Sequence, residues 1–306
     1  MSEKKTLTCG EWQVSYFPND FLSLSLSLAE KGGEFLEEWQ RHFPREETFV
    51  WNNYGVPSLF VRLDGVTTEL RDSQLSGNWL IFEVEERPAG LGLSSKINPP
   101  FKECLFRMKR LWPEFFALIS PKRTGFDDFL WLGQDHVRIG GPEDLPSHSL
   151  VLVRAEPEEE EYHILEQRSI STLKTKGCKM YGERLGLWRK VSINDINWDI
   201  PFVLKPLQGS KTKGIYIWHP QRKKEHGCST RSQILRAFQN SPTMYMQDWI
   251  EPFKRGDHYL ILRVYYGWDP EEKRWKCLGG VWNSRPNLLV HGAKDSFFGP
   301  IIFSNP

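Results

Sequence analysis

The chain of 306 residues is long enough for one large domain or for two or three smaller ones. Its 40 Lys and Arg residues against 39 Asp and Glu leave a formal charge of +1, and 39% of its residues are hydrophobic. These are globular proportions, which exclude wholesale disorder and collagen-like repeats. The balanced charge also argues against a nucleic-acid partner, because such proteins use a basic surface to neutralise phosphates.

The cysteines and the apolar segments indicate the compartment. The five cysteines, at positions 9, 104, 178, 228 and 277, are widely spaced and include no C-x-x-C pair. This pattern predicts neither a disulfide framework nor a zinc site, and it favours a reducing compartment. No apolar run approaches the ~20 residues that a membrane-spanning helix needs. We therefore expect a soluble, cytoplasmic protein with no membrane partner.

Hydrophobic periodicity predicts short strands and few helices in the first half of the chain. In chain order, the predicted elements are an alternating strand over Phe21–Leu28, a helix containing Phe35, Leu36 and Trp39, strands over Ser58–Leu63 and Asn78–Val84, an amphipathic helix over 101–119 that is interrupted or restarted at Pro113, and a strand over 149–155. An acidic run follows from Glu156 to Glu161, and we interpret it as a solvated turn between two halves.

Strands also dominate the second half. The predicted elements are a helix over Lys174–Trp188, strands over Phe202–Lys205 and Ile215–Trp218, a helix over Gln233–Phe238, and strands over Met244–Ile250, Tyr259–Tyr266 and Trp275–Trp282. Strands clustered around few helices predict an α+β protein with an antiparallel-rich core sheet. We divide the chain into an N-terminal part (1–160), a middle part (161–255) and C-terminal strands that complete the core (256–306).

A flexible loop lies between two strands in the segment 201–218, PFVLKPLQGSKTKGIYIW. Gly209 and Gly214 allow the backbone to fold back so that its N–H groups face an anion, while Lys205 and two further lysines supply positive charge. The segment lacks the residue order of a P-loop and the helix context of a dinucleotide-binding fold. By itself it fits a phosphate-binding loop and a hairpin with a basic turn equally well.

The segment 243–253, TMYMQDWIEPF, is a strand that runs into a polar linker. Together with the loop, it resembles the nucleotide clamp of the ATP-grasp ligases, in which two lysines hold the ATP phosphates, a Gly-rich loop covers them and a Q-[ED]-x-I linker contacts adenine. The resemblance implies a small α+β lid over the core sheet. The ATP-binding residues that it implies are Lys205 as the second lysine, Lys174 or Lys179 as the first, Gly209, Ser210 and Gly214 in the loop, Gln247, Asp248 and Ile250 in the hinge, and Asp257 at the ribose.

Two predicted strands of the first half carry paired charges. Asp64 comes two residues after Arg62, and Glu83 comes two residues before Glu85, so each pair lies on one face of its strand. If the two strands are neighbours, the three carboxylates converge, and buried carboxylates so close are unfavourable without a cation between them. Mg²⁺ prefers such oxygen ligands. The alternative is an exposed hairpin whose acids form salt bridges.

The order of these motifs resembles the glutathionylspermidine synthetase branch of the ATP-grasp enzymes, in which the metal-binding strands precede the lid. The stretch EERPAGLGL (85–93) resembles that family's E-x-N-x-D-T-P-T-x-L stretch, and the segments 279–282 and 293–301 resemble its closing segments. Glu85 replaces the family's Asn, and the segment 275–291 contains no acidic residue. The resemblance spans roughly residues 55–95 and 170–301 and does not include the amidase domain of bifunctional relatives.

The resemblance implies an ATP-dependent ligase that joins a carboxylate to an amine through an acyl phosphate. The implied cofactors are ATP and Mg²⁺, with the metal held by the three carboxylates, and the implied partners are a small-molecule or peptide carboxylate and an amine. Arg62, Arg263 and Arg285 are expected to stabilise the acyl phosphate or to bind a substrate carboxylate, and a structural salt bridge is the alternative for the last two. The competing hypotheses are a kinase-like or degenerate protein that binds or hydrolyses ATP, and a non-catalytic interaction module.

Overall fold

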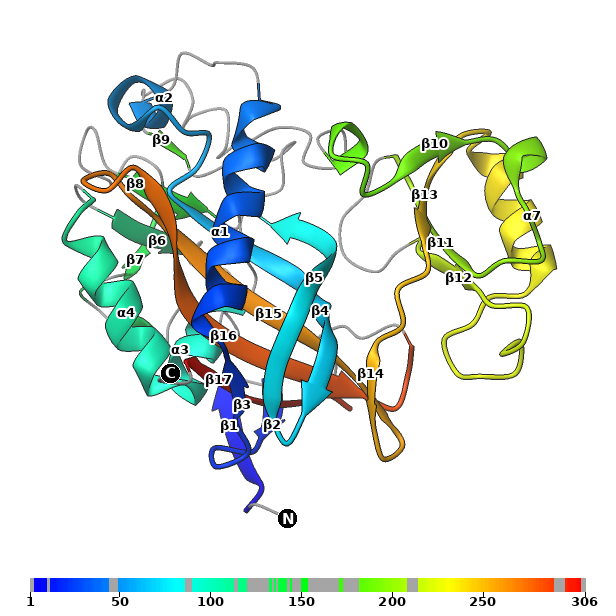
Figure 1. Ribbon diagram of the computed structural model, residues 1–306. Helices are drawn as coiled ribbons and strands as arrows, with labels where there is room; N and C mark the ends of the chain where they lie inside the picture. The colour runs from blue at the N-terminus through cyan, green and yellow to red at the C-terminus, as the bar shows by residue number, and fades with distance from the viewer. Residues whose placement is uncertain are drawn as a thin grey trace.

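The computed structural model of the chain describes residues 3–9, 12–43, 49–85, 90–112, 115–119, 132–133, 135, 137–141, 144, 150–153, 171–172, 182–207, 214–288 and 295–303. Three sheets and a small number of helices make up these residues, so the protein is of the α+β class (Figure 1). No helix in the described ranges is both long enough and apolar enough to cross a membrane.

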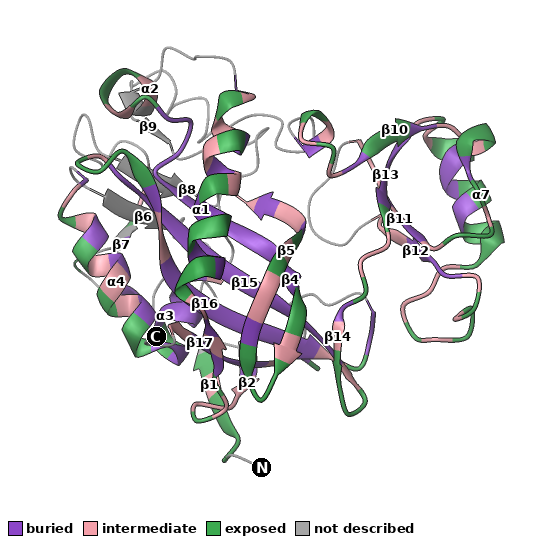
Figure 2. Ribbon diagram, in the orientation of Figure 1, coloured by how far each residue is buried: buried purple, intermediate pink, exposed green. Residues whose placement is uncertain are grey.

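The largest sheet is mixed and forms the centre of the molecule. In spatial order, its strands are β1 (Lys5–Cys9), β2 (Trp12–Tyr16), β17 (Phe297–Phe303), β16 (Arg274–Arg285), β15 (His258–Asp269), β4 (Phe60–Arg71), β5 (Gln74–Glu85) and β3 (Leu22–Leu24), with β14 (Phe253–Arg255) paired to β15. The short strand β3 pairs with both β5 and β17, which closes the path from β17 through β16, β15, β4 and β5 on itself. The three central strands β4, β15 and β16 are buried along most of their length (Figure 2).

The helix α1 (Leu26–Arg41) packs on one face of these central strands, which we call the α1 face. Gly32 and Gly33 allow the close approach, because a Cβ on Gly32 would lie 1.9 Å from the hydroxyl of Tyr266. The predicted strand over Phe21–Leu28 is therefore wrong in its second half. Ser25 caps the helix by accepting a hydrogen bond from Leu28 N at 3.3 Å, so only β3 remains extended.

The other face of the central strands carries the charged side chains, and we call it the polar face. Helices α3 (Leu91–Ile97) and α4 (Pro99–Lys109) cover part of it. Tyr265 of β15 lies here, with its hydroxyl 2.8 Å from that of Ser94 and its ring centroid 4.7 Å from that of Phe101. Asn98, between the two helices, donates hydrogen bonds to the strand carbonyls of Gly280 and Ile301 and thereby fixes both helices on the sheet.

A four-stranded parallel sheet lies beside the central sheet, with the order β7 (Val137–Ile139), β6 (Phe115–Ile119), β8 (Leu150–Val153) and β9 (Ser171–Thr172). The short helix α2 (Phe49–Tyr54) precedes β4 in the chain. The predicted helix over 101–119 is confirmed only as far as α4. Its second half is strand β6, because the pairing with β7 and β8 uses the backbone of this apolar segment and Pro113 supplies no N–H to continue a helix.

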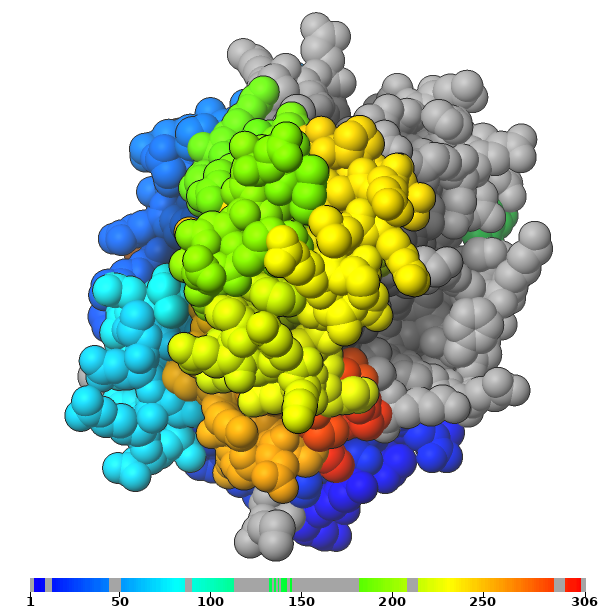
Figure 3. Space-filling view, turned by 90° about the vertical axis from the view of Figure 1, so that its right-hand side faces the viewer, coloured from blue at the N-terminus to red at the C-terminus, as the bar shows by residue number. Residues whose placement is uncertain are grey.

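The third sheet is antiparallel and, with one helix, forms a small unit that we call the lid. Its order is β10 (Arg189–Val191), β13 (Met244–Asp248), β11 (Phe202–Lys205) and β12 (Tyr216–Trp218), with the 3-10 helix Ile193–Asp195 between β10 and β11. Helix α7 (Arg231–Asn240) packs Ile234 and Phe238 against Phe202 and Leu204 in a core of its own. The space-filling view from the lid side shows this unit covering the centre of that face, above the β14–β15 turn (Figure 3).

Candidate functional site

Five charged side chains lie together on the polar face of three neighbouring strands. Arg62 of β4 is opposite Glu85 of β5, and Asp64 is opposite Glu83 on one side and Arg263 of β15 on the other. Directly opposed residues of an antiparallel pair point to the same face. The structure therefore brings together the three predicted metal ligands and two of the three predicted arginines, which come from separate strands.

Arg62 is the centre of this cluster. Its guanidinium binds Asp64 in a bidentate manner, at 2.5 Å from Nε to Oδ1 and 2.7 Å from Nη2 to Oδ2, and it also binds Glu85. Arg62 and Asp64 are only 3% and 6% exposed. A buried charge must be compensated in this way. The Nε of Arg263 lies 3.7 Å from Asp64 Oδ2 and adds a second cation.

Burial and charge shift the pKa values of the cluster in opposite directions. Burial opposes the charge of Arg62, but the nearby Asp64 and Glu85 outweigh it and raise the Arg62 pKa well above its ordinary value. Burial raises the pKa of Glu85 to about 7, against the attraction of Arg62. Burial and the repulsion from Arg62 lower the pKa of Arg263. The raised pKa of Glu85 lies close to neutral pH.

Arg62 forms ion pairs with two of the three predicted metal ligands. Arg62 binds Asp64 and Glu85, while the side chain of Glu83 makes no hydrogen bond or ion pair with the part of the chain that the structure describes. Across the same residues, no group of three His, Cys, Asp or Glu is placed to hold a metal ion. Arg62 thus bridges Asp64 and Glu85 and leaves Glu83 outside the ion pairs, and a Mg²⁺ site at these carboxylates stays a prediction.

Two lid residues contact the sheet beside this cluster. Lys205 Nζ and Gln247 Nε2 both donate to the carbonyl oxygen of Phe82, at 3.1 and 3.2 Å. They come from the neighbouring lid strands β11 and β13, and Lys205 Nζ also lies 4.6 Å from the ring centroid of Trp188. Phe82 directly precedes Glu83. The predicted phosphate lysine, the predicted hinge glutamine and the charged cluster thus meet along a single strand, β5.

The remaining hinge and loop residues lie around this junction or beyond the described ranges. Asp248 is exposed at the end of β13, and Ile250 is half-buried just after it. Gly214 has a φ of 79°, which favours glycine, and packs near Pro206. Four predicted phosphate-binding residues lie outside the described residues: Lys174, Lys179, Gly209 and Ser210.

Two predicted residues lie away from the cluster. Asp257 is exposed in the turn between β14 and β15, so the structure does not place it with the other candidates. Arg285 lies on the polar face opposite Tyr259, and its Nε is 2.9 Å from Asp295 Oδ1. Arg285 shares a strand face with the buried residue Asn283.

Two residues of the polar face were not among the residues predicted from the sequence. Tyr265 is fully buried opposite Arg62, and burial raises its pKa above the ordinary value. Asn283 is fully buried between Ile261 and Phe298 of the adjoining strands. The signal was the i, i+2 alternation, which places Tyr265 on the face of Arg263 and Asn283 on the face of Arg285.

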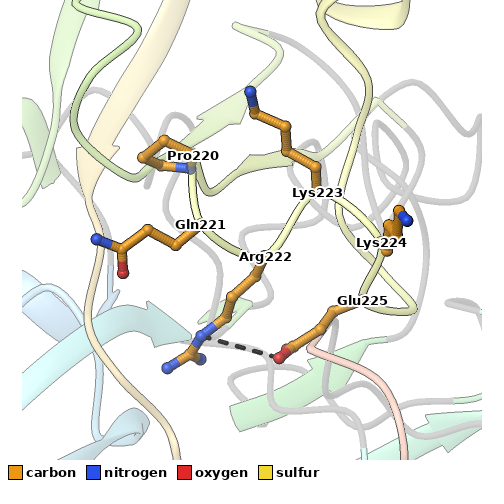
Figure 4. A pocket seen from close by; sticks show the side chains of 6 residues that line it. All are labelled: Pro220, Gln221, Arg222, Lys223, Lys224 and Glu225. Carbon is orange, nitrogen blue, oxygen red and sulfur yellow. Dashed lines mark ion pairs between the residues drawn. The ribbon is translucent and has the colours of Figure 1, made fainter.

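The basic turn of the lid, Pro220–Glu225, lines a hollow on the surface (Figure 4). The side chains of Arg222 and Glu225 point toward one another there, with a closest N–O distance of 3.9 Å. Arg222 Nη1 also donates to Glu251 at 2.7 Å, and the hydroxyl of Tyr259 donates to Glu225 at 2.5 Å. The turn is therefore tied to β15 through Glu225 and to the linker before β14 through Arg222.

Comparison with known proteins adds no assignment to this geometry. No protein-family model matches the chain, and no curated protein matches it. The functional interpretation therefore depends on the residues that the fold brings together: the arginine-bridged carboxylates, Lys205 and Gln247.

Proposed function

We propose that this protein is an ATP-dependent ligase that joins a carboxylate to an amine. The observation that carries the proposal is the junction at β5, where Lys205 and Gln247 of the lid meet the strand that bears Glu83 and Glu85. A nucleotide clamp requires a lysine and a polar hinge on one structural unit that face a charged cluster on the other. An ATP-grasp fold for these units is part of the proposal.

The proposed chemistry needs charge neutralisation and positioning more than covalent help from the protein. A carboxylate oxygen of the first substrate attacks the γ-phosphorus of ATP, and ADP leaves. The amine then attacks the carbonyl carbon of the acyl phosphate, inorganic phosphate leaves, and the amine gives up a proton. Lys205 holds phosphate oxygens, and the planar guanidinium groups of Arg62 and Arg263 stabilise the negative charge of the acyl phosphate.

The first experiment is thermal unfolding with ATP or a non-hydrolysable analogue. At about 100 times its dissociation constant, the nucleotide should stabilise the wild-type protein by roughly 2.7 kcal/mol. Lys205→Met should lose most of this gain. The matched control is Lys223→Met, because Lys223 Nζ also lies over a lid tryptophan, 5.5 Å from the ring centroid of Trp218, but belongs to the basic turn. The proposal fails if neither nucleotide stabilises the wild type, or if Lys205→Met keeps the full shift.

Magnesium is tested in the same assay. If Mg²⁺ binds at the carboxylates, the nucleotide shift should increase when Mg²⁺ is added, and Glu83→Gln should remove that increase. An increase that persists in Glu83→Gln would assign the metal to the nucleotide alone.

The second candidate is a protein that binds or hydrolyses ATP without forming an amide. Its support is the salt bridging of Asp64 and Glu85 by Arg62, which occupies two of the three predicted metal ligands. Release of ADP that requires both a carboxylate and an amine supports the ligase. Release that requires neither supports the second candidate.

A further inference from the structure

The lid is basic although the chain as a whole is nearly neutral. Between Arg189 and Asp248 the sequence has ten Lys and Arg residues against four Asp and Glu, a net charge of +6. The rest of the chain has thirty against thirty-five, a net charge of −5, so the overall charge of +1 is the sum of two regions of opposite sign. Such an asymmetry favours a polyanionic partner for the basic region.

Three cations of the lid have no acidic partner. Lys223 and Lys224 of the basic turn and Arg231 at the start of α7 are exposed. Among the residues that the structure describes, none of the three forms an ion pair, in contrast to Arg222 of the same turn. Lys223 extends away from the pair that Arg222 makes with Glu225 (Figure 4). The charge of these three side chains is therefore available to a partner.

A pair of tryptophans connects two of these cations. The ring centroids of Trp198 and Trp218 are 5.1 Å apart, and Trp218 Nε1 donates to the carbonyl oxygen of Trp198 at 2.9 Å. The guanidinium carbon of Arg231 lies over Trp198, 4.6 Å from the ring centroid, and Lys223 Nζ lies over Trp218 at 5.5 Å. The basic turn and the start of α7 therefore bring their charges to one surface of the lid.

The combination of cations and rings selects among polyanions. Lysine and arginine bind the phosphates of any nucleic acid. A guanidinium that lies over an aromatic ring keeps its N–H edge open to a phosphate, and its other face is a platform on which a base can stack. Single strands expose their bases for such stacking. An acidic peptide would use the charges of this surface but not the platform.

We propose that the lid binds single-stranded nucleic acid on the surface formed by Lys223, Lys224, Arg231 and Trp198, which we call the outer surface of the lid. The two lysines bind phosphates. A base stacks on the guanidinium of Arg231, which Trp198 supports from below, and the N–H edge of the same group binds the adjoining phosphate.

The outer surface is separate from the candidate nucleotide clamp. Phe202 of β11 is directly opposite Trp218 of β12, so both side chains point to the α7 face of the lid sheet. Lys205 comes three residues after Phe202 and points to the other face, where it contacts the carbonyl oxygen of Phe82. The tryptophan pair and Lys205 therefore lie on opposite faces of the lid sheet, and this proposal does not rest on the ligase function.

The test measures the fluorescence anisotropy of a labelled oligonucleotide of about twelve uridines with the full chain. If three cations bind phosphates, the logarithm of the affinity should fall with the logarithm of the salt concentration with a slope of about −2, which is roughly a 20-fold loss between about 50 and 200 mM salt. Removing both lysines, as Lys223→Gln with Lys224→Gln, should weaken binding and flatten this slope. The matched control is Lys102→Gln, because Lys102 Nζ also lies over a ring, 5.3 Å from the centroid of Phe106, but belongs to α4.

The variant Arg231→Lys separates stacking from charge. Lysine keeps the positive charge but not the planar group, so the salt dependence should stay the same while the affinity falls about fivefold or more, the lower end of what one stacked base contributes. Because Arg231 is exposed, the melting temperature of the free variant should match that of the wild type. An unchanged affinity in Arg231→Lys would overturn the assignment to single strands.

The remaining outcomes separate the outer surface from other anion sites. No binding at about 50 mM salt, or a loss in Lys102→Gln as large as in the lysine variant of the lid, would overturn the proposal. A labelled peptide of about twelve glutamates that binds as tightly as the oligonucleotide would assign the surface to acidic proteins instead. Lys205→Met should keep the oligonucleotide; if it loses the oligonucleotide together with ATP, the strand occupies the nucleotide clamp, and the outer surface is excluded while the ligase proposal stands.

Discussion

Arg62→Met tests whether charge compensation by Arg62 holds the polar face together. Methionine keeps much of the aliphatic volume but removes the cation that Asp64 and Glu85 share. The nearest remaining cation at Asp64 is Arg263, at 3.7 Å. We expect the free energy of unfolding near pH 8 to fall by about 3–5 kcal/mol, the range for breaking a buried ion pair.

The magnitude follows from the geometry of the cluster. Two unit charges about 4 Å apart attract by about 4 kcal/mol at an effective dielectric constant of about 20. Because Arg62 serves two carboxylates, the gross attraction is about 8 kcal/mol. Burying the guanidinium opposes this by several kcal/mol, which leaves a net contribution in the expected range.

The loss of unfolding free energy in Arg62→Met should also depend on pH, because Glu85 titrates. Burial raises its pKa from an ordinary value of 4.5 to about 7, so the folded protein binds this proton more tightly than the unfolded chain does. The stability from this group is fully present below pH 4.5 and is lost as the pH rises through 7. Removing Arg62 takes away the attraction that lowers this pKa. At pH 5 Glu85 is protonated with or without Arg62, so the variant loses no attraction to it there, and the loss of stability at pH 5 should be smaller than at pH 8.

Urea unfolding at pH 5 and pH 8 measures both effects. Arg41→Met is the control, because Arg41 Nη1 bonds to Glu38 at 2.7 Å but both side chains are more than half exposed, and such pairs contribute less than about 1 kcal/mol. A loss of stability in Arg62→Met no larger than in Arg41→Met, or of the same size at both pH values, would show that Arg62 does not hold the cluster by charge compensation.

Two further variants test how the elements pack. Asn98→Ala should lower the free energy of unfolding by about 2–3 kcal/mol in urea titrations, because it removes the side-chain donor to the carbonyls of Gly280 and Ile301; a loss below about 0.5 kcal/mol would contradict this. Gly32→Ala should destabilise the protein by about 1–3 kcal/mol although alanine favours helices, because its Cβ would collide with the hydroxyl of Tyr266; the opposite sign would mean that α1 can move away from the sheet.

Local patterns predicted the charged strands well. The i, i+2 spacing placed Arg62 with Asp64, and Glu83 with Glu85, on shared faces, and the structure confirms that β4 and β5 are neighbours. This prediction succeeded because alternation is a property of a single strand and needs no partner. The same approach gave a wrong prediction of helix for the strand Phe115–Ile119, because short apolar runs fit a helix and a buried strand equally well.

The chain itself therefore determined the α+β class, most of the strands, and which charged residues share a strand face, because these follow from periodicity and backbone stereochemistry. Only the tertiary structure decided which strands are neighbours and which charges meet. The pairing of β4 with β15 placed Arg263 opposite Asp64. The fold also placed the guanidinium of Arg62 between Asp64 and Glu85, two carboxylates that were expected to bind a metal. Within the described residues, it also left the side-chain amide of Asn283 buried without a hydrogen-bond partner. These features depend on contacts between residues far apart in the sequence, where the free energy of burial, and not local propensity, selects the partner.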